Sequence, residues 1–426
     1  MAGAFTDLGS SFKELYPQSV VEAMVNDDAP FRKELKRSVP SSYKVNEGLV
    51  TFLAETGTQQ AIGQMADGID LPPAMDRTDV RLVLKPTNFA AAIQLGLLTM
   101  TAGNSNKSAF NGGEVARNTN GAIAHLGKFI ESTYCGTHGT GRRARVESDG
   151  TSLFVAALPE GVKLLREGYY LTGRSTDAGS VSGSFDAQRI TAITRSTRTV
   201  TYGGTDRTLT AGDHIHITTV ASQTLTSTFA NGLRGLVDDG TYLTTVHGLS
   251  RDTYPLLKSQ VFSNGGVRRN LSESLLVGAI HDTEEFSGKK ITHIWCGSDQ
   301  IEKAMEFTAP DRRIMATSSN PGDRAMGYKT QQHIYVGATD AALHRSFDIV
   351  PGELFGLNMD TFFHYVAQEL GPMELGGVNM FNLTPGSSTY KASLLGYVLA
   401  QENIGCERFD ANFVMRDLKS RQLGDA

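Results

Sequence analysis

The sequence predicts an α+β protein, in which helices and strands occupy separate stretches of one chain. Hydrophobic residues make up 40% and charged residues 20% of the 426 positions, which is typical of globular proteins with a sizeable core. Residues 189–218 alternate apolar and polar side chains as strands do, whereas residues 272–287 carry an apolar stripe at helical spacing. Residues 229–255 are rich in glycine and lack any grouping of nucleophile, acid, base or metal ligand, which indicates an architectural role.

The composition argues against several classes of protein. The net charge of −5 does not fit a protein whose main task is to grip nucleic acid, because phosphate binding needs a concentrated basic face. No run reaches the ~18 apolar residues of a spanning helix, and the first residues lack the basic start and apolar core of a signal peptide. The three cysteines, Cys135, Cys296 and Cys406, are odd in number and far apart. We therefore expect reduced, buried thiols in a protein made in the cytoplasm.

Residues 1–42 predict an arm. A short helical stripe of apolar side chains is interrupted by Pro17 and ends near Pro30. Because one such stripe cannot bury itself, we expect it to pack on another part of the chain or on a neighbouring subunit. Its leading members are Phe12, Leu15 and Tyr16. The basic residues that we expect to face nucleic acid, if any do, are Lys33, Lys36 and Arg37.

Residues 43–84 predict a long hairpin. Two apolar runs, 49–54 and 80–84, bracket a polar stretch from Glu55 to Asp79 that contains little to hold it on a core. Two strands that bracket such a stretch form a hairpin that projects from the body. A loop of this length is uncommon in a compact domain unless it is functional or finds support elsewhere.

The middle of the chain predicts a long helix and then a small β module. Within residues 85–144, apolar side chains from Ala122 to Thr133 fall at helical spacing, and Gly136 supplies a stop. Residues 145–228 change to short alternating runs separated by turn residues, which is typical of antiparallel strands. We interpret this β module as an insertion between two domains.

Residues 229–384 predict a compact α+β domain. Ser272 is placed to cap a helix, with Leu271 and Leu276 as a hydrophobic staple and Gly288 as the stop. A strand at 291–296 and a second helix from Ser298 follow. Residues 385–426 predict mostly extended chain.

Candidate chemical sites are weak, and we predict no catalytic, cofactor or metal site. His214-x-His216 places two imidazoles on one side of a strand, as zinc ligands require, but the sequence offers no third ligand to pair with them. Cys135-x-x-His138 lacks a second Cys/His pair. A faint phosphate loop at 121–128 fails because Phe129 stands where a magnesium-binding Ser or Thr is needed.

Two motifs, together with the order of the segments described above, resemble the major capsid proteins of tailed bacteriophages. This is the shell family with the Hong Kong 97-type fold. One is the turn Gly232-Leu233-Arg234-Gly235, and the other is the loop 57–73 with its ending Asp67-Gly68-Ile69-Asp70-Leu71-Pro72. The resemblance implies an N-terminal arm (1–42), an extended loop (43–84), a peripheral domain with a spine helix (85–144) and an axial α+β domain (229–384). It further implies that residues 385–426 return to the peripheral domain, and it leaves 145–228 as an inserted small β domain.

By this resemblance the chain is a structural protein and not an enzyme. It is expected to assemble as hexamers and pentamers into an icosahedral virion shell around double-stranded DNA, in the host cytoplasm and without a membrane. Expected partners are other copies of the chain, a scaffolding protein, a portal protein and possible cement protein, with weak non-specific contact to the packaged DNA. The scaffold is expected to be separately encoded, since no long charged helical leader precedes the arm. The expected assembly-interface residues are Phe12, Leu15, Tyr16, Ile62, Met65, Asp67, Ile69, Leu71, Pro72 and Arg77.

The sequence departs from the founding members of the family at one chemical point. Those members lock their shells with Lys–Asn isopeptide bonds that use a lysine on the extended loop. This sequence has no lysine between Lys44 and Lys85. We therefore expect a shell held by non-covalent contacts.

Two alternative functions remain at the level of sequence. A cellular nanocompartment shell of the encapsulin type shares the fold but encloses enzymes, and the nature of the cargo would distinguish it. A soluble hydrolase would need catalytic residues that converge only in three dimensions, with Ser250, His281, Asp282 and Glu284 as scattered candidates.

Overall fold

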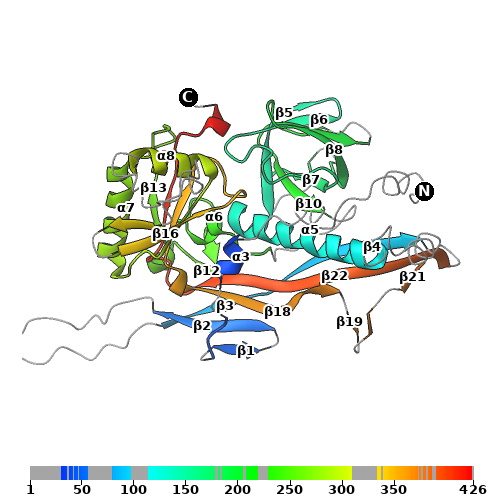
Figure 1. Cartoon of the computed structure of the whole chain (residues 1–426), viewed down its shortest axis with the longest axis horizontal. Coiled ribbons are helices and arrows are strands. Elements are labelled where there is room, and N and C mark those ends of the chain that lie inside the picture. The colour runs from blue at the N-terminus through cyan, green and yellow to red at the C-terminus, as the bar shows by residue number, and fades with distance from the viewer. Residues whose placement is uncertain are drawn as a thin grey trace, which may run out of the picture. The chain divides into compact units, whose positions relative to one another are not determined.

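The protein is described from a computed structural model (Figure 1). The described residues are 30–35, 38–41, 43–46, 48–55, 79–96, 114–177, 181–182, 185–204, 208–218, 229–308, 333–336, 339–372, 374–375, 378–379, 382–385 and 390–424. The chain divides into two compact units. The first comprises Met1–Arg32, Pro86–Glu131 and Val366–Asn403, and the second comprises Lys33–Lys85, Ser132–Tyr365 and Ile404–Ala426.

The first unit is built on the long strand β22 (Tyr390–Cys406), most of which lies in this unit. Strand β4 (Thr87–Gly96) pairs with it antiparallel from Glu402↔Thr87 to Ser393↔Gly96. The same sheet contains β18 (Phe362–Pro372) and β21 (Asn382–Pro385), and the short strands β19 (Glu374–Leu375) and β20 (Val378–Asn379) pair with each other.

Helix α5 (Glu114–Gly136) lies along this sheet (Figure 1). Its Leu126 and Ile130 are buried, and the Phe129 ring meets the Phe89 ring of β4 edge to face at 6.2 Å. The helix expected around residues 122–134 is therefore confirmed. The observed helix is longer because it begins at Glu114 and ends at Gly136, where its last turn belongs to the second unit.

The short helix α3 (Pro30–Glu34) is tied to α5 within the first unit. The carboxylate of Glu131 accepts hydrogen bonds from the backbone amides of Phe31 and Arg32 at 2.9 and 3.0 Å. Arg32 in turn pairs with the fully buried Glu402 of β22 at 2.7 Å. These contacts anchor the expected arm (1–42) just after the point where its apolar stripe was expected to end.

A three-stranded sheet in the second unit confirms the predicted hairpin. Strand β2 (Leu49–Glu55) pairs antiparallel with β3 (Asp79–Leu84), and β1 (Lys44–Asn46) pairs with the other edge of β2. The base is held firmly, because the buried Phe52 packs on Phe363 and Tyr43 at ring distances of 5.2 Å. Residues 56–78, which join β2 to β3, lie outside the described residues.

The predicted β module is a closed antiparallel barrel with the strand order β10-β5-β6-β9-β8-β7 (Figure 1). Its strands are β5 (Arg142–Gly150), β6 (Leu153–Ala156), β7 (Tyr170–Arg174), β8 (Gln188–Thr194), β9 (Thr199–Gly203) and β10 (His214–Thr218). Inward side chains such as Phe154, Phe185 and Ile215 form its core. Closure removes the exposed strand edges that an open insertion would carry. The first strand begins at Arg142, three residues before the expected start of the module at 145.

A six-stranded mixed sheet forms the other core of the second unit, with the order β13-β23-β17-β14-β16-β15. Its strands are β13 (Gln260–Phe262), β14 (His293–Cys296), β15 (His333–Val336), β16 (Thr339–Arg345), β17 (Leu354–Leu357) and β23 (Phe413–Met415). Helices α7 (Glu273–Ser287) and α8 (Ser298–Thr308) accompany it. The predicted cap is confirmed, because the Ser272 side chain accepts a hydrogen bond from the Leu275 amide and Gly288 ends α7 in the left-handed conformation.

The course of the C-terminal tail differs from the expected return to the peripheral domain. Residues up to Asn403 belong to the first unit, but Ile404–Ala426 belong to the second, where β23 lies between β13 and β17. All three residues of β23 are buried, as in a central strand covered on both faces. Conversely, the expected axial domain (229–384) ends too late, since Val366–Asn403 belong to the first unit. The reason is that β18 and β22 each run without interruption from one unit to the other.

Candidate functional site

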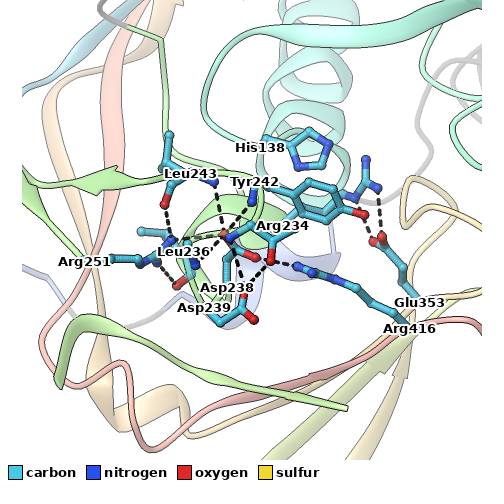
Figure 2. A network of polar contacts seen from close by, with 12 residues as sticks. His138, Arg234, Leu236, Asp238, Asp239, Tyr242, Leu243, Arg251, Glu353 and Arg416 are labelled. Atoms are coloured by element: carbon cyan, nitrogen blue, oxygen red, sulfur yellow. Dashed lines mark hydrogen bonds and ion pairs between the residues drawn. The ribbon is translucent and has the colours of Figure 1, made fainter. Parts of the chain in front are cut away.

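The glycine-rich segment 229–255 forms a buried polar network in the second unit (Figure 2). It contains helix α6 (Leu233–Leu236), which lies against the chain leaving α5. A Cβ atom on Gly232 would lie 2.2 Å from the carbonyl oxygen of Thr137, and one on Gly235 would lie 1.9 Å from that of His138. Neither distance is possible for a real side chain. The two glycines are therefore required by backbone-to-backbone contact rather than by an unusual φ angle.

Arg234 lies on α6, and its guanidinium group reaches Glu353 (Figure 2). Its Nε and Nη2 atoms donate to the two carboxylate oxygens of Glu353 at 2.8 Å each, and Nη1 donates to Glu160 at 2.9 Å. Glu160 follows barrel strand β6, and Glu353 directly precedes β17. Because Arg234 is only 1% exposed, this paired guanidinium is a buried connector of the two substructures.

Tyr242 covers this connector with its ring. The guanidinium carbon of Arg234 lies 5.2 Å, and that of Arg416 4.1 Å, from the centre of the Tyr242 ring. The ring of His138 lies 4.2 Å away from it. The aromatic ring thus separates two like-charged guanidinium groups and interacts favourably with both.

Asp238 is the acceptor around which the following loop folds. Its side chain is fully buried, and donors of two kinds reach its two oxygens (Figure 2). The donors are the backbone amides of Gly240, Tyr242 and Leu243 at 3.0, 2.9 and 3.1 Å and the guanidinium groups of Arg416 and Arg251 at 2.7 and 3.5 Å. These hydrogen bonds and ion pairs satisfy the buried carboxylate and fix the loop.

Arg251 closes the same loop by binding its carbonyl groups. It donates to the backbone oxygens of Leu236, Leu243 and Leu257 at 2.7, 2.8 and 2.9 Å. The short strands β11 (Thr245–Val246) and β12 (Leu249–Ser250) and the 3-10 turn η1 (Pro255–Leu257) lie within this span. Arg251 therefore satisfies three carbonyl groups of the loop from within, as buried polar networks require.

The pKa values of the network follow from burial and pairing. Burial alone would lower the pKa of Arg234 and raise that of Glu160. The ion pairs with Glu353 and Glu160 outweigh burial for Arg234, whose pKa is raised, and Arg234 together with His138 and Arg142 holds the pKa of Glu160 well below its usual range. Both shifts have the sign expected of a charged pair that is intact at neutral pH.

Two buried histidines of this region are neutral. Burial, with Arg234 nearby, lowers the pKa of His138 to about 3, and burial, with Arg251 nearby, lowers that of His247 to about 3. The contacts agree, because Nε2 of His138 lies 2.6 Å from the donor Arg142 and Nε2 of His247 accepts from the Cys406 amide at 3.4 Å.

We expect this neutrality to make the second unit sensitive to mild acid. The folded pKa values lie below the ordinary value of 6.5, so the stability they confer is complete above pH 6.5 and is lost as the pH falls toward 3. On unfolding, these two side chains should together bind about one proton at pH 6.5 and about two at pH 5. Urea unfolding followed by the single, buried Trp295 at several pH values measures this uptake.

A variant pair identifies the source of the acid sensitivity. His247→Gln retains an acceptor and should reduce the proton uptake by about one, whereas His281→Gln, at an exposed position of α7, should leave it unchanged. Equal uptake in the wild type and in His247→Gln would contradict this explanation.

The four residues considered for a hydrolase either make hydrogen bonds to nearby backbone or are exposed. The Ser250 hydroxyl accepts from the Asp252 amide, and Glu284 accepts from the Ile291 amide. His281 and Asp282 are exposed on α7. A hollow lined by Asp299, Glu302 and Arg421, and by none of these candidates, measures about 70 Å³, far below the ~300 Å³ of an ordinary ligand pocket. None of these features supports a catalytic grouping within the described part of the chain.

The predicted interface residues, and two of the three residues expected to face DNA, fall outside the described part of the chain. Lys36 and Arg37 lie outside the described residues, as do Phe12, Leu15, Tyr16, Ile62, Met65, Asp67, Ile69, Leu71, Pro72 and Arg77. Lys33 is described, and it is exposed on α3. The three cysteines are free and buried as expected, and burial raises the pKa of Cys296 and of Cys406 to about 12.

The sequence singled out the turn around Arg234 but missed its partners. Glu160 and Glu353 lie 74 and 119 residues away from Arg234 along the chain, and nothing local marks either as a buried ion-pair partner. Asp177, which lies beside His214 and His216 in the barrel, was missed for the same reason.

Comparison with known proteins identifies the fold through solved structures. No family model matches this sequence, and none of the curated proteins compared with it does. No described helix is long and apolar enough to cross a membrane. The chain is similar to one in the cyanophage A-1(L) capsid asymmetric unit, with a TM-score of 0.55 and 12% identity over 97% of this chain and 99% of that one.

Two further solved structures are similar at lower scores. They are the capsid of the native GTA particle (TM-score 0.47, 7% identity, 98% and 100% of the two chains) and the holo-SrpI encapsulin complex from Synechococcus elongatus PCC 7942 (TM-score 0.40, 8% identity, 95% and 97%). TM-scores below 0.5 are too low to support an assignment, so the cyanophage likeness carries it. The chain has the fold of phage major capsid proteins, which is the Hong Kong 97-type fold.

Proposed function

We propose that this chain is the major capsid protein of a tailed bacteriophage. It assembles as hexamers and pentamers into an icosahedral shell around double-stranded DNA and is a structural protein of the virion. The observation that carries the proposal is the likeness to the cyanophage capsid chain, which extends over nearly the whole of both chains. A shared fold does not by itself fix a function, so the proposal also rests on the parts of the chain suited to association.

The hairpin formed by β2 and β3 is the part of the chain that we consider suited to association. Its base is fixed by Phe52, Phe363 and the hydrogen bond from the Val83 amide to the His247 carbonyl at 3.0 Å. Residues 56–78 connect the two strands of this base in the sequence, and we assign their Ile62, Met65, Ile69 and Leu71 to apolar contacts with neighbouring subunits. Many such contacts, repeated by symmetry, stabilise a closed shell although each one is modest.

The charge balance suits a container for DNA. A net charge of −5 leaves most of the phosphate charge to mobile counterions. Lys33, exposed on α3, together with Lys36 and Arg37, is our candidate for weak, non-specific contact with the packaged DNA. A scaffolding protein, a portal protein and a cement protein complete the proposed set of partners, with assembly in the host cytoplasm.

Electron microscopy of the purified recombinant chain, with and without a scaffold partner, tests the proposal. Shells, or mixtures of hexamers and pentamers, support it. A chain that stays monomeric under both conditions contradicts it. Particles isolated from the native source distinguish a virus from a nanocompartment, since a virus contains double-stranded DNA and a nanocompartment contains enzyme cargo.

The shell should come apart without breaking covalent bonds. Because the segment between Lys44 and Lys85 has no lysine, the extended loop lacks the amine that an isopeptide bond needs. When mature particles are boiled in detergent, this chain should run as a single band at the 45.9 kDa of the monomer. A ladder of covalent multimers would show that another lysine forms the bond and would overturn the non-covalent assignment.

A further inference from the structure

Two histidines and an aspartate meet on the outside of the barrel. His214 and His216 lie two residues apart on β10, on the face opposite Ile215, whose side chain belongs to the barrel core. Asp177 follows the end of β7, the strand that pairs with β10. Its Oδ1 atom lies 2.5 Å from Nδ1 of His214 and 3.7 Å from Nε2 of His216. One ligand atom from each of the three residues lies within 4.8 Å of the other two.

His216 is the least satisfied member of this cluster. Its side chain is completely buried, and neither ring nitrogen makes a hydrogen bond within the described structure. Buried polar atoms normally have a partner, and leaving one without costs stability. The Nε2 atom faces the carboxylate of Asp177 from a distance too long for a hydrogen bond. An ion held between them would supply the missing partner.

We propose that Asp177, His214 and His216 form a binding site for one divalent transition-metal ion of the zinc class. Two imidazoles and one carboxylate are a common set of three zinc ligands, and water takes the fourth position. Ligand bonds of about 2.0–2.2 Å place the ligand atoms roughly 3.3 Å apart. His214 and Asp177 therefore separate slightly when the ion binds, and His216 moves closer. Magnesium and calcium prefer all-oxygen ligands and are expected to bind poorly here.

The surroundings set the affinity and the route of entry. Nη1 of Arg142 lies 4.0 Å from the second carboxylate oxygen of Asp177, and Arg174 is nearby on β7. These cations oppose a metal ion, although Arg142 is also paired with Glu160 at 3.4 Å. His214 and Asp177 keep 13% and 25% of their side chains exposed, which leaves a path from solvent. Bound metal would tie the chain after β7 to β10.

The test is zinc binding by the unassembled full-length chain, stripped of metal with a chelator. Competition with a chromophoric chelator in excess magnesium should show one zinc equivalent per chain at this site. Asp177→Asn keeps a group able to hydrogen-bond His214 and should weaken zinc affinity by at least the ~10–100-fold that loss of a partner behind a ligand costs. His214→Gln, at a partly exposed position, should do the same, and both variants should melt normally without metal.

A control variant and a spectroscopic measurement distinguish binding at this site from binding elsewhere on the chain. His281→Gln changes an exposed histidine on α7 and should bind zinc as the wild type does. Cobalt bound to the wild type should show the visible absorption of a tetrahedral site, and Asp177→Asn should lose it. The proposal is overturned if both ligand variants retain wild-type zinc affinity, or if no zinc binds to the wild type. Because shell formation is not measured, failure here leaves the capsid assignment unaffected.

Discussion

Replacing Gly235 by alanine is expected to destabilise the second unit by about 3 kcal/mol or more, the upper end of the range for overpacking a core. The new Cβ atom would lie 1.9 Å from the carbonyl oxygen and 2.6 Å from the carbonyl carbon of His138. Both are backbone atoms, so no flexible side chain is able to give way. Either α6 or the chain after α5 must move, and Arg234 would then lose its alignment with Glu160 and Glu353.

Urea unfolding of the unassembled chain measures this effect through Trp295, the single tryptophan, which is buried on β14 of the same unit. The matched control is Gly278→Ala in α7. A Cβ atom at Gly278 meets nothing within 4 Å, and alanine is the better helix former. That variant should be as stable as the wild type or slightly more so. If both alanine variants unfold at the same urea concentration, the backbone contact at Gly235 is not as close as described.

Local signals in the sequence were sufficient for many elements of the fold. The Ser272 cap, the Gly288 stop and the pairing of β2 with β3 were each predicted from residue type and spacing, because each depends on neighbours in the sequence. The importance of Gly232 and Gly235 was also visible as a motif. The reason for it was not, since the obstructing atoms belong to Thr137 and His138, about a hundred residues earlier in the chain.

Contacts between segments that are far apart in the sequence could not be predicted from such local signals. The sequence Phe413-Val414-Met415 is too short to show that it is a central strand, and its neighbours β13 and β17 come from distant segments. Likewise, His214 and His216 suggested a metal pair, but only the closed barrel brings Asp177 to them. Burial on both sides and convergence of distant side chains are tertiary properties, and a periodic pattern does not encode them.

Replacing Arg234 by methionine is expected to destabilise the second unit by about 3–5 kcal/mol at pH 7, the usual cost of removing one partner from a buried ion pair. Methionine fills the space of the arginine stem but leaves Glu160 and Glu353 buried without their shared cation. The matched control is Arg421→Met. Arg421 is 77% exposed in its pair with Glu302, and loss of a surface pair should cost less than about 1 kcal/mol.

The pH dependence of Arg234→Met separates lost charge pairing from lost packing. Without the guanidinium, burial should raise the folded pKa of Glu160 above its unfolded value, because Arg234 is the strongest of the groups that oppose burial there. A raised pKa confers stability that is present below the unfolded pKa and is lost as the pH rises, so the deficit of the variant should be smaller at pH 5 than at pH 7. The triple variant with Glu160→Gln and Glu353→Gln should recover much of the loss at pH 7. A deficit that is equal at both pH values and unaffected by the glutamines would mean that Arg234 acts through its packing alone.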